Sequence, residues 1–169
     1  MATSDIVLHA IVPLSITLGV VGFGLIAKWY VWPSLRNVPA REALVILILP
    51  HVFRYLGLTF LVPGVTSVPL NPRFADPSAY GDLATAVLAL ASIAALRANS
   101  RLAVPLVWIM SAVGLGDFIN AFPLGLTLQN PGDFGACIFL AIIFVPLLMV
   151  SHILIIAKLL QKAPTRAHA

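Results

Sequence analysis

The fold class of this chain follows from one stretch of its sequence, Ala43-Leu-Val-Ile-Leu-Ile-Leu-Pro-His-Val-Phe-Arg-Tyr-Leu-Gly-Leu-Thr-Phe-Leu-Val62. Its length and its apolar side chains match a helix that crosses a lipid bilayer, which takes about 20 residues. Arg54 is the exception, because a full charge at membrane depth is costly and usually faces a protein or water-filled interior beside an opposite charge. The stretch therefore predicts a membrane-spanning helix with a polar site at Arg54.

The composition of the whole chain agrees with a membrane protein. Of its 169 residues, 60% are hydrophobic and only 9% are charged, whereas roughly a quarter of a soluble domain is charged. Spans of about 20 residues each use nearly all of this length, so we expect one integral membrane domain over residues 1–169. The single cysteine, Cys137, excludes a disulfide within the chain and a cysteine-based metal site. No metal site is expected.

Five apolar segments predict an all-α, polytopic membrane helical bundle with five transmembrane helices. They cover residues 6–31, 43–62, 78–96, 102–126 and 134–160. No Lys or Arg precedes the first segment, so we expect it to stay as a helix rather than to be removed as a signal peptide. The loop from Pro63 to Pro77 is rich in proline, which predicts a stiff, extended connection rather than a helix.

The basic residues predict the orientation of the bundle. Most of the ten Lys and Arg residues lie between the first and second segments, between the third and fourth, or near the carboxyl terminus: Lys28, Arg36, Arg41, Arg97, Arg101, Lys158, Lys162 and Arg166. Because positive loops favour the cytoplasmic side, the amino terminus should lie outside and the carboxyl terminus in the cytoplasm. We expect a multi-pass protein of the cell inner membrane. Positive charge scattered in this way does not indicate a nucleic-acid partner.

Helical rise brings three charges to a similar depth. Counting about 1.5 Å per residue from the nearest basic anchor, Arg54 stands about 20 Å, Asp82 about 22 Å and Asp117 about 24 Å above the cytoplasmic end. Long side chains can bridge these differences, so we expect Arg54 to lie between two carboxylates. The alternative is that Asp82 belongs to the outer interface, where a carboxylate near a helix amino terminus is favourable. Asp117 would then be the sole partner.

Other polar side chains are expected near the same level. Asn120 shares a helix face with Asp117, His51 shares one with Arg54 and Tyr55, and His9 comes from the first segment at a similar height. The candidate ligand-binding residues are therefore Arg54, His51, Tyr55, Asp82, Asp117, Asn120 and His9.

These residues support three functional hypotheses. The first is a polar pocket in the outer half of the bundle that binds or transports a small anionic or amphipathic molecule, with Arg54 supplying the charge. The second is a structural or assembly subunit in which the ion network fixes helix register. The third is an intramembrane enzyme that uses His51 or an acid as a general acid/base. Because the sequence carries no soluble-enzyme motif, binding is favoured over catalysis.

No cofactor is expected. The alternative is a haem held by His51 and His152, which lie at similar heights, although no second histidine follows at a helical repeat on either segment. The expected partners are the lipid bilayer, a small-molecule ligand, and either a second copy of the chain or another membrane subunit.

Overall fold

The computed structural model of the chain describes the backbone of residues 3–161 and the side chains of residues 10–161. Within this range every regular element is helical and no strand occurs. Five segments are long and apolar enough to cross a membrane, and we number them as spans one to five: Ala10–Leu35, Ala40–Leu61, Pro72–Arg97, Ala103–Leu128 and Leu140–Leu160. The predicted all-α architecture with five such helices is confirmed.

Span one continues beyond its predicted end at residue 31. It is formed by α1 (Thr3–Ile26), which begins before the span, the π-helical turn η1 (Ala27–Val31) and α2 (Trp32–Leu35). The helix passes through the π turn, in which the N–H of Trp32 donates to the carbonyl of Ala27. A proline follows in the first turn of α2, where its missing N–H is tolerated.

Span two changes helix type halfway along. It consists of α3 (Ala40–Val52) and the 3₁₀ helix η2 (Phe53–Leu61), where the sequence predicted one regular helix. The change begins where the N–H of Phe53 donates to the carbonyl of Pro50, three residues earlier. Pro50 itself has no N–H, which leaves the carbonyl of Ile46 within α3 without its usual helical bond.

Span three is α4 (Pro72–Arg97) and begins at Pro72 rather than at Ser78. This corrects the extended structure predicted for the second half of the 63–77 loop. Asn71 starts the helix as its N-cap, because its side chain accepts a hydrogen bond from the backbone N–H two residues later, and a proline in the first position is favourable. Asp82 consequently lies about 15 Å inside the helix at the usual rise, so the alternative that placed it at a helix amino terminus is wrong.

Span four is α5 (Ala103–Leu128), close to its predicted range. Span five combines the π-helical turn η4 (Leu140–Phe144) with α6 (Val145–Leu160). Its predicted start at residue 134 falls instead in a 3₁₀ turn, η3 (Pro131–Cys137), whose regular geometry is interrupted at Gly135.

Gly135 of η3 lies against the loop of residues 62–71, at the same end of the bundle as the amino terminus. Its φ is 51°, and a Cβ there would meet the carbonyl oxygen of Val65 and the amide nitrogen of Ser67. Beside it, the N–H of Ser67 donates to the backbone carbonyl of Asp133 at 3.0 Å, and the N–H of Ala136 donates to the backbone carbonyl of Val65 at 3.2 Å. Only glycine fits this backbone conformation without strain, and the 62–71 loop is thereby fastened to η3.

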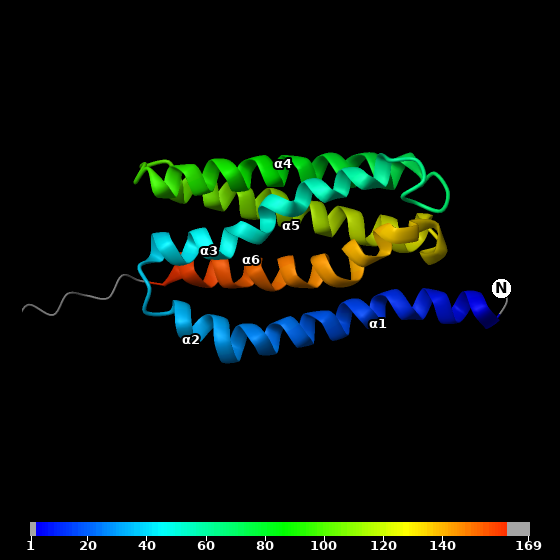
Figure 1. Cartoon of the computed structure of the whole chain (residues 1–169), viewed down its shortest axis with the longest axis horizontal. Coiled ribbons are helices and arrows are strands. Elements are labelled where there is room, and N and C mark those ends of the chain that lie inside the picture. Colours follow the sequence, from blue (N-terminus) through cyan, green and yellow to red (C-terminus); the bar gives the residue numbers. More distant parts are fainter. Residues whose placement is uncertain (1–2, 162–169) are drawn as a thin grey trace, which may run out of the picture.

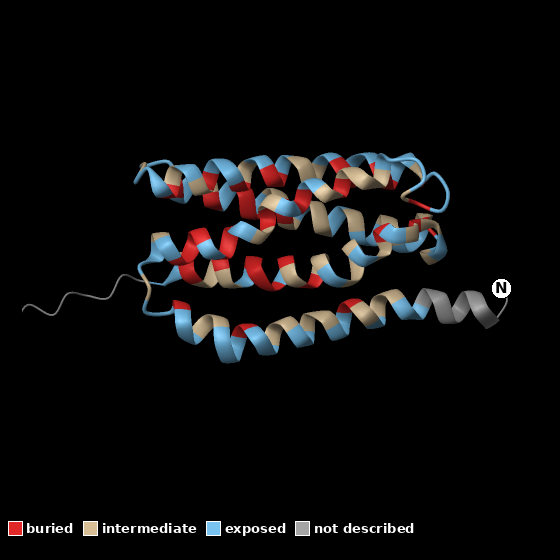
Figure 2. Cartoon of the chain, viewed as in Figure 1, coloured by how far each residue is buried: buried red, intermediate tan, exposed pale blue. Residues whose placement is uncertain are grey.

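The helices form a bundle in which span two runs obliquely (Figure 1). α4 and α5 pack side by side, and α3 packs against both α4 and α6. η2 packs instead mainly against α4, whereas α5 and α6 touch each other little. α1 lies at the edge of the bundle against α6, and most of its described surface is exposed or half-buried (Figure 2).

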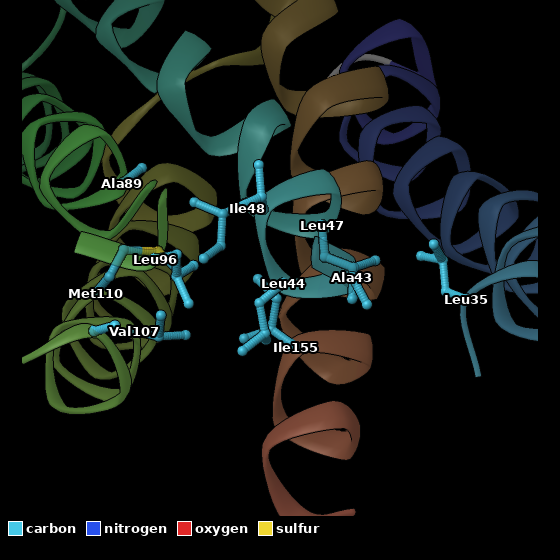
Figure 3. Close-up of a cluster of buried hydrophobic side chains, with 12 residues drawn as sticks. Leu35, Ala43, Leu44, Leu47, Ile48, Ala89, Leu96, Val107, Met110 and Ile155 are labelled. Atoms are coloured by element: carbon cyan, nitrogen blue, oxygen red, sulfur yellow. The ribbon is translucent and has the colours of Figure 1, made fainter. Parts of the chain in front are cut away.

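A cluster of buried apolar side chains joins all five spans at the end of the bundle away from the amino terminus (Figure 3). Leu44 and Ile48 of α3 lie between Ile155 of α6 and Val107 and Met110 of α5. Small residues of α3 and α4 in the same cluster allow the helices to approach closely. This end of the bundle is tightly packed. The other end, around η2, contains a cavity.

Candidate functional site

Arg54 of η2 is enclosed by groups from two other spans. Its Nε donates to Oδ1 of Asp82 on α4 at 2.6 Å, and its Nη2 donates to Oδ2 of Asp117 on α5 at 2.5 Å. Nη1 donates to the carbonyl oxygen of Gly114 on α5 at 3.3 Å. The contacts expected from helix depth are therefore present, and Arg54, Asp82 and Asp117 are called the triad below. One planar guanidinium bonds three acceptors at once, as its fork of donors permits.

The ring of Phe118 closes a face of the same guanidinium. The Cζ atom of Arg54 lies 4.2 Å from the centre of this ring, a distance typical of a cation–π contact. The side chain of Arg54 has 0% of its surface exposed. The charge is therefore held by protein groups on its edges and on one face.

Three glycines make room for these polar side chains. A Cβ at any of them would overlap a side chain of the following span, and the pairs are Gly57 with Asp82, Gly81 with Asp117, and Gly114 with His152. Gly57 lies three residues after Arg54, on the same face of the 3₁₀ helix η2. The carboxylate of Asp82 can therefore rest on Gly57 and reach Arg54 at the same time. Without glycine the backbones could not approach so closely.

His51 and His152 form a fully buried pair next to the triad. Their ring centres are 4.2 Å apart with an interplanar angle of 52°, and both residues are 0% exposed. None of their ring nitrogens has a hydrogen-bond partner among the described residues. A haem between them would require the touching rings to move apart. In the part of the chain that the structure describes, no group of three or more His, Cys, Asp or Glu side chains is placed to hold a metal.

A cavity of about 430 Å³ adjoins the triad. Side chains from all five spans line it, and most are apolar, with Phe60 of η2, Phe122 of α5 and Phe144 of η4 among them. Arg54, Asp82 and Asp117 belong to its wall. This volume lies within the range of small-molecule sites, which typically combine apolar walls with a few polar groups.

The structure does not bring Tyr55, Asn120 or His51 to this cavity. Tyr55 is 46% exposed, Asn120 is exposed, and neither lines the cavity. The 3₁₀ helix explains Tyr55, because side chains four residues apart no longer share a face there, and the expected alignment with His51 is lost. His51 also lies outside the cavity lining. The side chain of His9 lies outside the described residues.

Two cavity residues were not anticipated from the sequence. Ser78 is 3% exposed and Gln129 is 6% exposed, and neither the Ser78 hydroxyl nor the Gln129 amide nitrogen has a hydrogen-bond partner among the described residues. Ser78 precedes Asp82 by four residues and so shares its helix face. That spacing would have indicated Ser78 if the helix had been recognised to begin before it.

Two polar side chains attach span five to its neighbours. The hydroxyl of Ser151 donates to the carbonyl of Leu47 on α3 at 2.6 Å. Lys158, which is 3% exposed, donates from Nζ to the carbonyls of Leu35 at 2.8 Å and Arg36 at 3.0 Å. The sequence had suggested Lys158 only as a basic residue of the cytoplasmic end.

Comparison with known proteins places the whole site within a family. A protein-family model described as a domain of unknown function (DUF8737) matches residues 11–160. The matched range contains the triad, the two histidines and every residue that lines the cavity. No curated protein and no solved structure matches the chain significantly.

Proposed function

We propose that this chain, which belongs to the family described as a domain of unknown function (DUF8737), is a multi-pass membrane protein that binds a small amphipathic molecule beside Arg54. The apolar body of the ligand would lie among the apolar walls of the cavity. Its polar end would reach the triad. The observation that carries the proposal is that a cavity of about 430 Å³ has a buried ion cluster in its mostly apolar wall.

The cavity wall carries charged residues that a helix does not need in order to cross a bilayer. Charged residues at membrane depth are a functional hypothesis by default, with their partners named. Here the partners are Asp82 and Asp117, and both carboxylates lie on the cavity wall. A ligand that enters the cavity therefore meets charge on one side and apolar side chains elsewhere.

We further propose that the protein lies in the cell inner membrane with its amino terminus outside. Arg36 and Arg41 lie in or beside the connection between spans one and two, and Arg97 and Arg101 in or beside the connection between spans three and four. Both connections are at the same end of the bundle (Figure 1). This end would face the cytoplasm by the positive-inside rule.

A structural role is the second candidate, and the glycine contacts favour it. Gly57, Gly81 and Gly114 fit the polar side chains closely, as expected if the ion cluster fixes helix register. The two roles are compatible, because a rigid cluster also presents a fixed polar surface to the cavity. Catalysis by His51 has less support, since a general acid/base needs hydrogen-bond reach of a substrate and His51 does not line the cavity.

Binding of simple amphiphiles tests the proposal. The purified protein in zwitterionic lipid nanodiscs would be incubated separately with decylamine, decanol and decanoate, which share one chain and differ in the polar end. Native mass spectrometry would count bound molecules and give affinities. We expect one molecule of at least one probe to bind each protein.

Variants show whether the probe occupies the cavity. Ala141 lines it, and Ala141→Phe should lower affinity at least about tenfold, the equivalent of roughly 1.4 kcal/mol, because the added ring occupies the space. Ala91 is exposed on α4 and outside the lining, so Ala91→Phe is the matched control and should bind like the unchanged protein. If no probe binds the unchanged protein better than it binds Ala141→Phe, the proposed function is wrong.

A further inference from the structure

We infer that the polar end of the ligand is a hydrogen-bond donor, and in its strongest form a protonated amine, that binds at the Asp82 carboxylate beside Ser78. This inference rests on the proposed function, because it names the chemistry of the molecule that the cavity takes. It departs from the anionic ligand that Arg54 suggests when the sequence is considered alone.

Arg54 has no exposed N–H donor to offer an anion. Its Nε and Nη2 are bonded to the two carboxylates of the triad, its Nη1 faces the Gly114 carbonyl, and Phe118 covers one of its faces. The side chain is 0% exposed. An anionic ligand would have to displace a carboxylate that already holds a charge-assisted hydrogen bond, which is among the strongest kinds in proteins.

The part of the triad that remains open is carboxylate. The side chain of Asp82 is 18% exposed and that of Asp117 is 7% exposed. Asp82 uses Oδ1 for Arg54, and its Oδ2 makes no hydrogen bond to the described residues. When both carboxylates are ionised, the triad carries a formal charge of −1, because Arg54 supplies the single positive charge. In surroundings of low dielectric constant this charge attracts a cation much more strongly than it would in water.

Ser78 supplies the second acceptor. It lies one helical turn before Asp82 on the same face of α4, it lines the cavity, and its buried hydroxyl has no partner among the described residues. Buried polar groups are usually hydrogen-bonded, and an unpaired one calls for an explanation. An ammonium group carries three N–H donors and no acceptor, so it can bond Asp82 and Ser78 together.

The rim of the cavity favours a ligand that comes from the bilayer. Ile119, Phe122 and Leu126 of α5 and Met149 of α6 line the cavity and are also exposed, by 75%, 44%, 42% and 37%. In a chain that spans the membrane, these side chains face lipid. The apolar chain of an amphiphile can therefore enter the cavity from the bilayer between these side chains, and its polar end can reach the carboxylates.

The three decyl probes separate this inference from the proposed function. For the unchanged protein in zwitterionic nanodiscs at neutral pH, decylamine should bind most tightly and decanoate least. We expect at least about a tenfold difference between these two, the size of effect of one hydrogen bond to a charged group. The Ala141→Phe variant, whose cavity is filled, gives the baseline signal of probe that has only partitioned into the lipid.

Two serine variants locate the amine without disturbing the triad. Ser78→Ala should weaken decylamine binding several-fold and leave thermal stability unchanged, because the hydroxyl has no partner to lose. Ser92→Ala is the matched control, because Ser92 is also buried on α4 with an unpartnered hydroxyl but lies outside the cavity. Its decylamine affinity should equal that of the unchanged protein. Asp82→Asn should remove the preference for decylamine over decanol.

Three outcomes would overturn the inference. If decanoate binds most tightly, the ligand is anionic and the proposed function survives without this inference. If Ser78→Ala binds decylamine as well as Ser92→Ala does, the amine does not sit at Ser78 and Asp82. If no probe exceeds the Ala141→Phe baseline, the proposed function fails and this inference fails with it.

Discussion

At the scale of single residues, Arg54 depends on positions that carry no charge. Burying an ion costs several kcal/mol unless its partners compensate for lost hydration. The compensation comes from Asp82 and Asp117, and these reach Arg54 because Gly57 and Gly81 let the helices approach. A methyl group added at either glycine would therefore act on the ion cluster as well as on the backbone.

Gly81→Ala should lower the melting temperature of the protein. Its Cβ would overlap the carboxylate of Asp117, and overpacking of this kind costs about 1–3 kcal/mol. Gly116→Ala is the control, because the space around Gly116 is open and alanine favours a helix over glycine by about 1 kcal/mol. Thermal unfolding followed by size-exclusion chromatography would measure both. Equal effects of the two variants would contradict the close contact at Gly81.

The sequence predicted the contacts of Arg54 because a helix rises by a constant amount per residue. Depth alone was therefore enough to bring Asp82 and Asp117 to the same level. It could not predict the side of the helix that Tyr55 faces, because the change to a 3₁₀ helix depends on hydrogen bonds around Pro50 rather than on composition. It also gave no indication of the glycine contacts, which depend on how two particular helices cross.

At the scale of elements, Lys158 attaches span one to the rest of the bundle. Its ammonium donates to the carbonyls of Leu35 and Arg36 at the carboxyl end of a helix, where the last carbonyls have no partner within the helix. A cation is also favoured there by the helix dipole. Because α1 lies at the edge of the bundle and packs on α6 and the segment before it, this contact fixes the end of span one.

Lys158→Met should loosen span one. Methionine keeps the apolar stem of lysine but removes hydrogen bonds from a charged group, which are worth about 1.5–3 kcal/mol each. We expect a lower melting temperature and faster proteolytic cleavage in the connection between spans one and two. Lys28→Met serves as the control, because Lys28 is exposed in η1. Lys158 would lose its assigned role if both variants were cleaved at the same rate.

The boundaries of the elements were less predictable than their number. Proline was interpreted as a residue that keeps the 63–77 connection extended, yet Pro72 occupies the first position of α4 after the Asn71 cap. The same residue type can therefore end one element or begin another, and the cap decides which. The sequence pattern puts Ser78 at the first position of its span, whereas in the structure it lies inside α4 with a buried, unpartnered hydroxyl.

At the scale of the whole molecule, the basic residues predict which end faces the cytoplasm. A reporter inserted in the 98–102 connection should read as cytoplasmic, and one inserted in the 62–71 loop should read as external. Green fluorescent protein and alkaline phosphatase fusions would measure the two sides independently, since the first fluoresces inside and the second is active outside. A cytoplasmic signal from the 62–71 loop would require a different orientation.

The order of the glycine contacts along the chain has a consequence for biogenesis. Gly57, Gly81 and Gly114 each belong to the span that is synthesised immediately before the span whose polar side chain they accept, from span two to span five. A helix leaving the insertion machinery thus finds its docking position already present in the lipid. The last contact of this kind closes the structure, because Pro146 of span five lies against Gly19 of span one. The three contacts of Gly57, Gly81 and Gly114 can therefore form in the order in which the spans are synthesised.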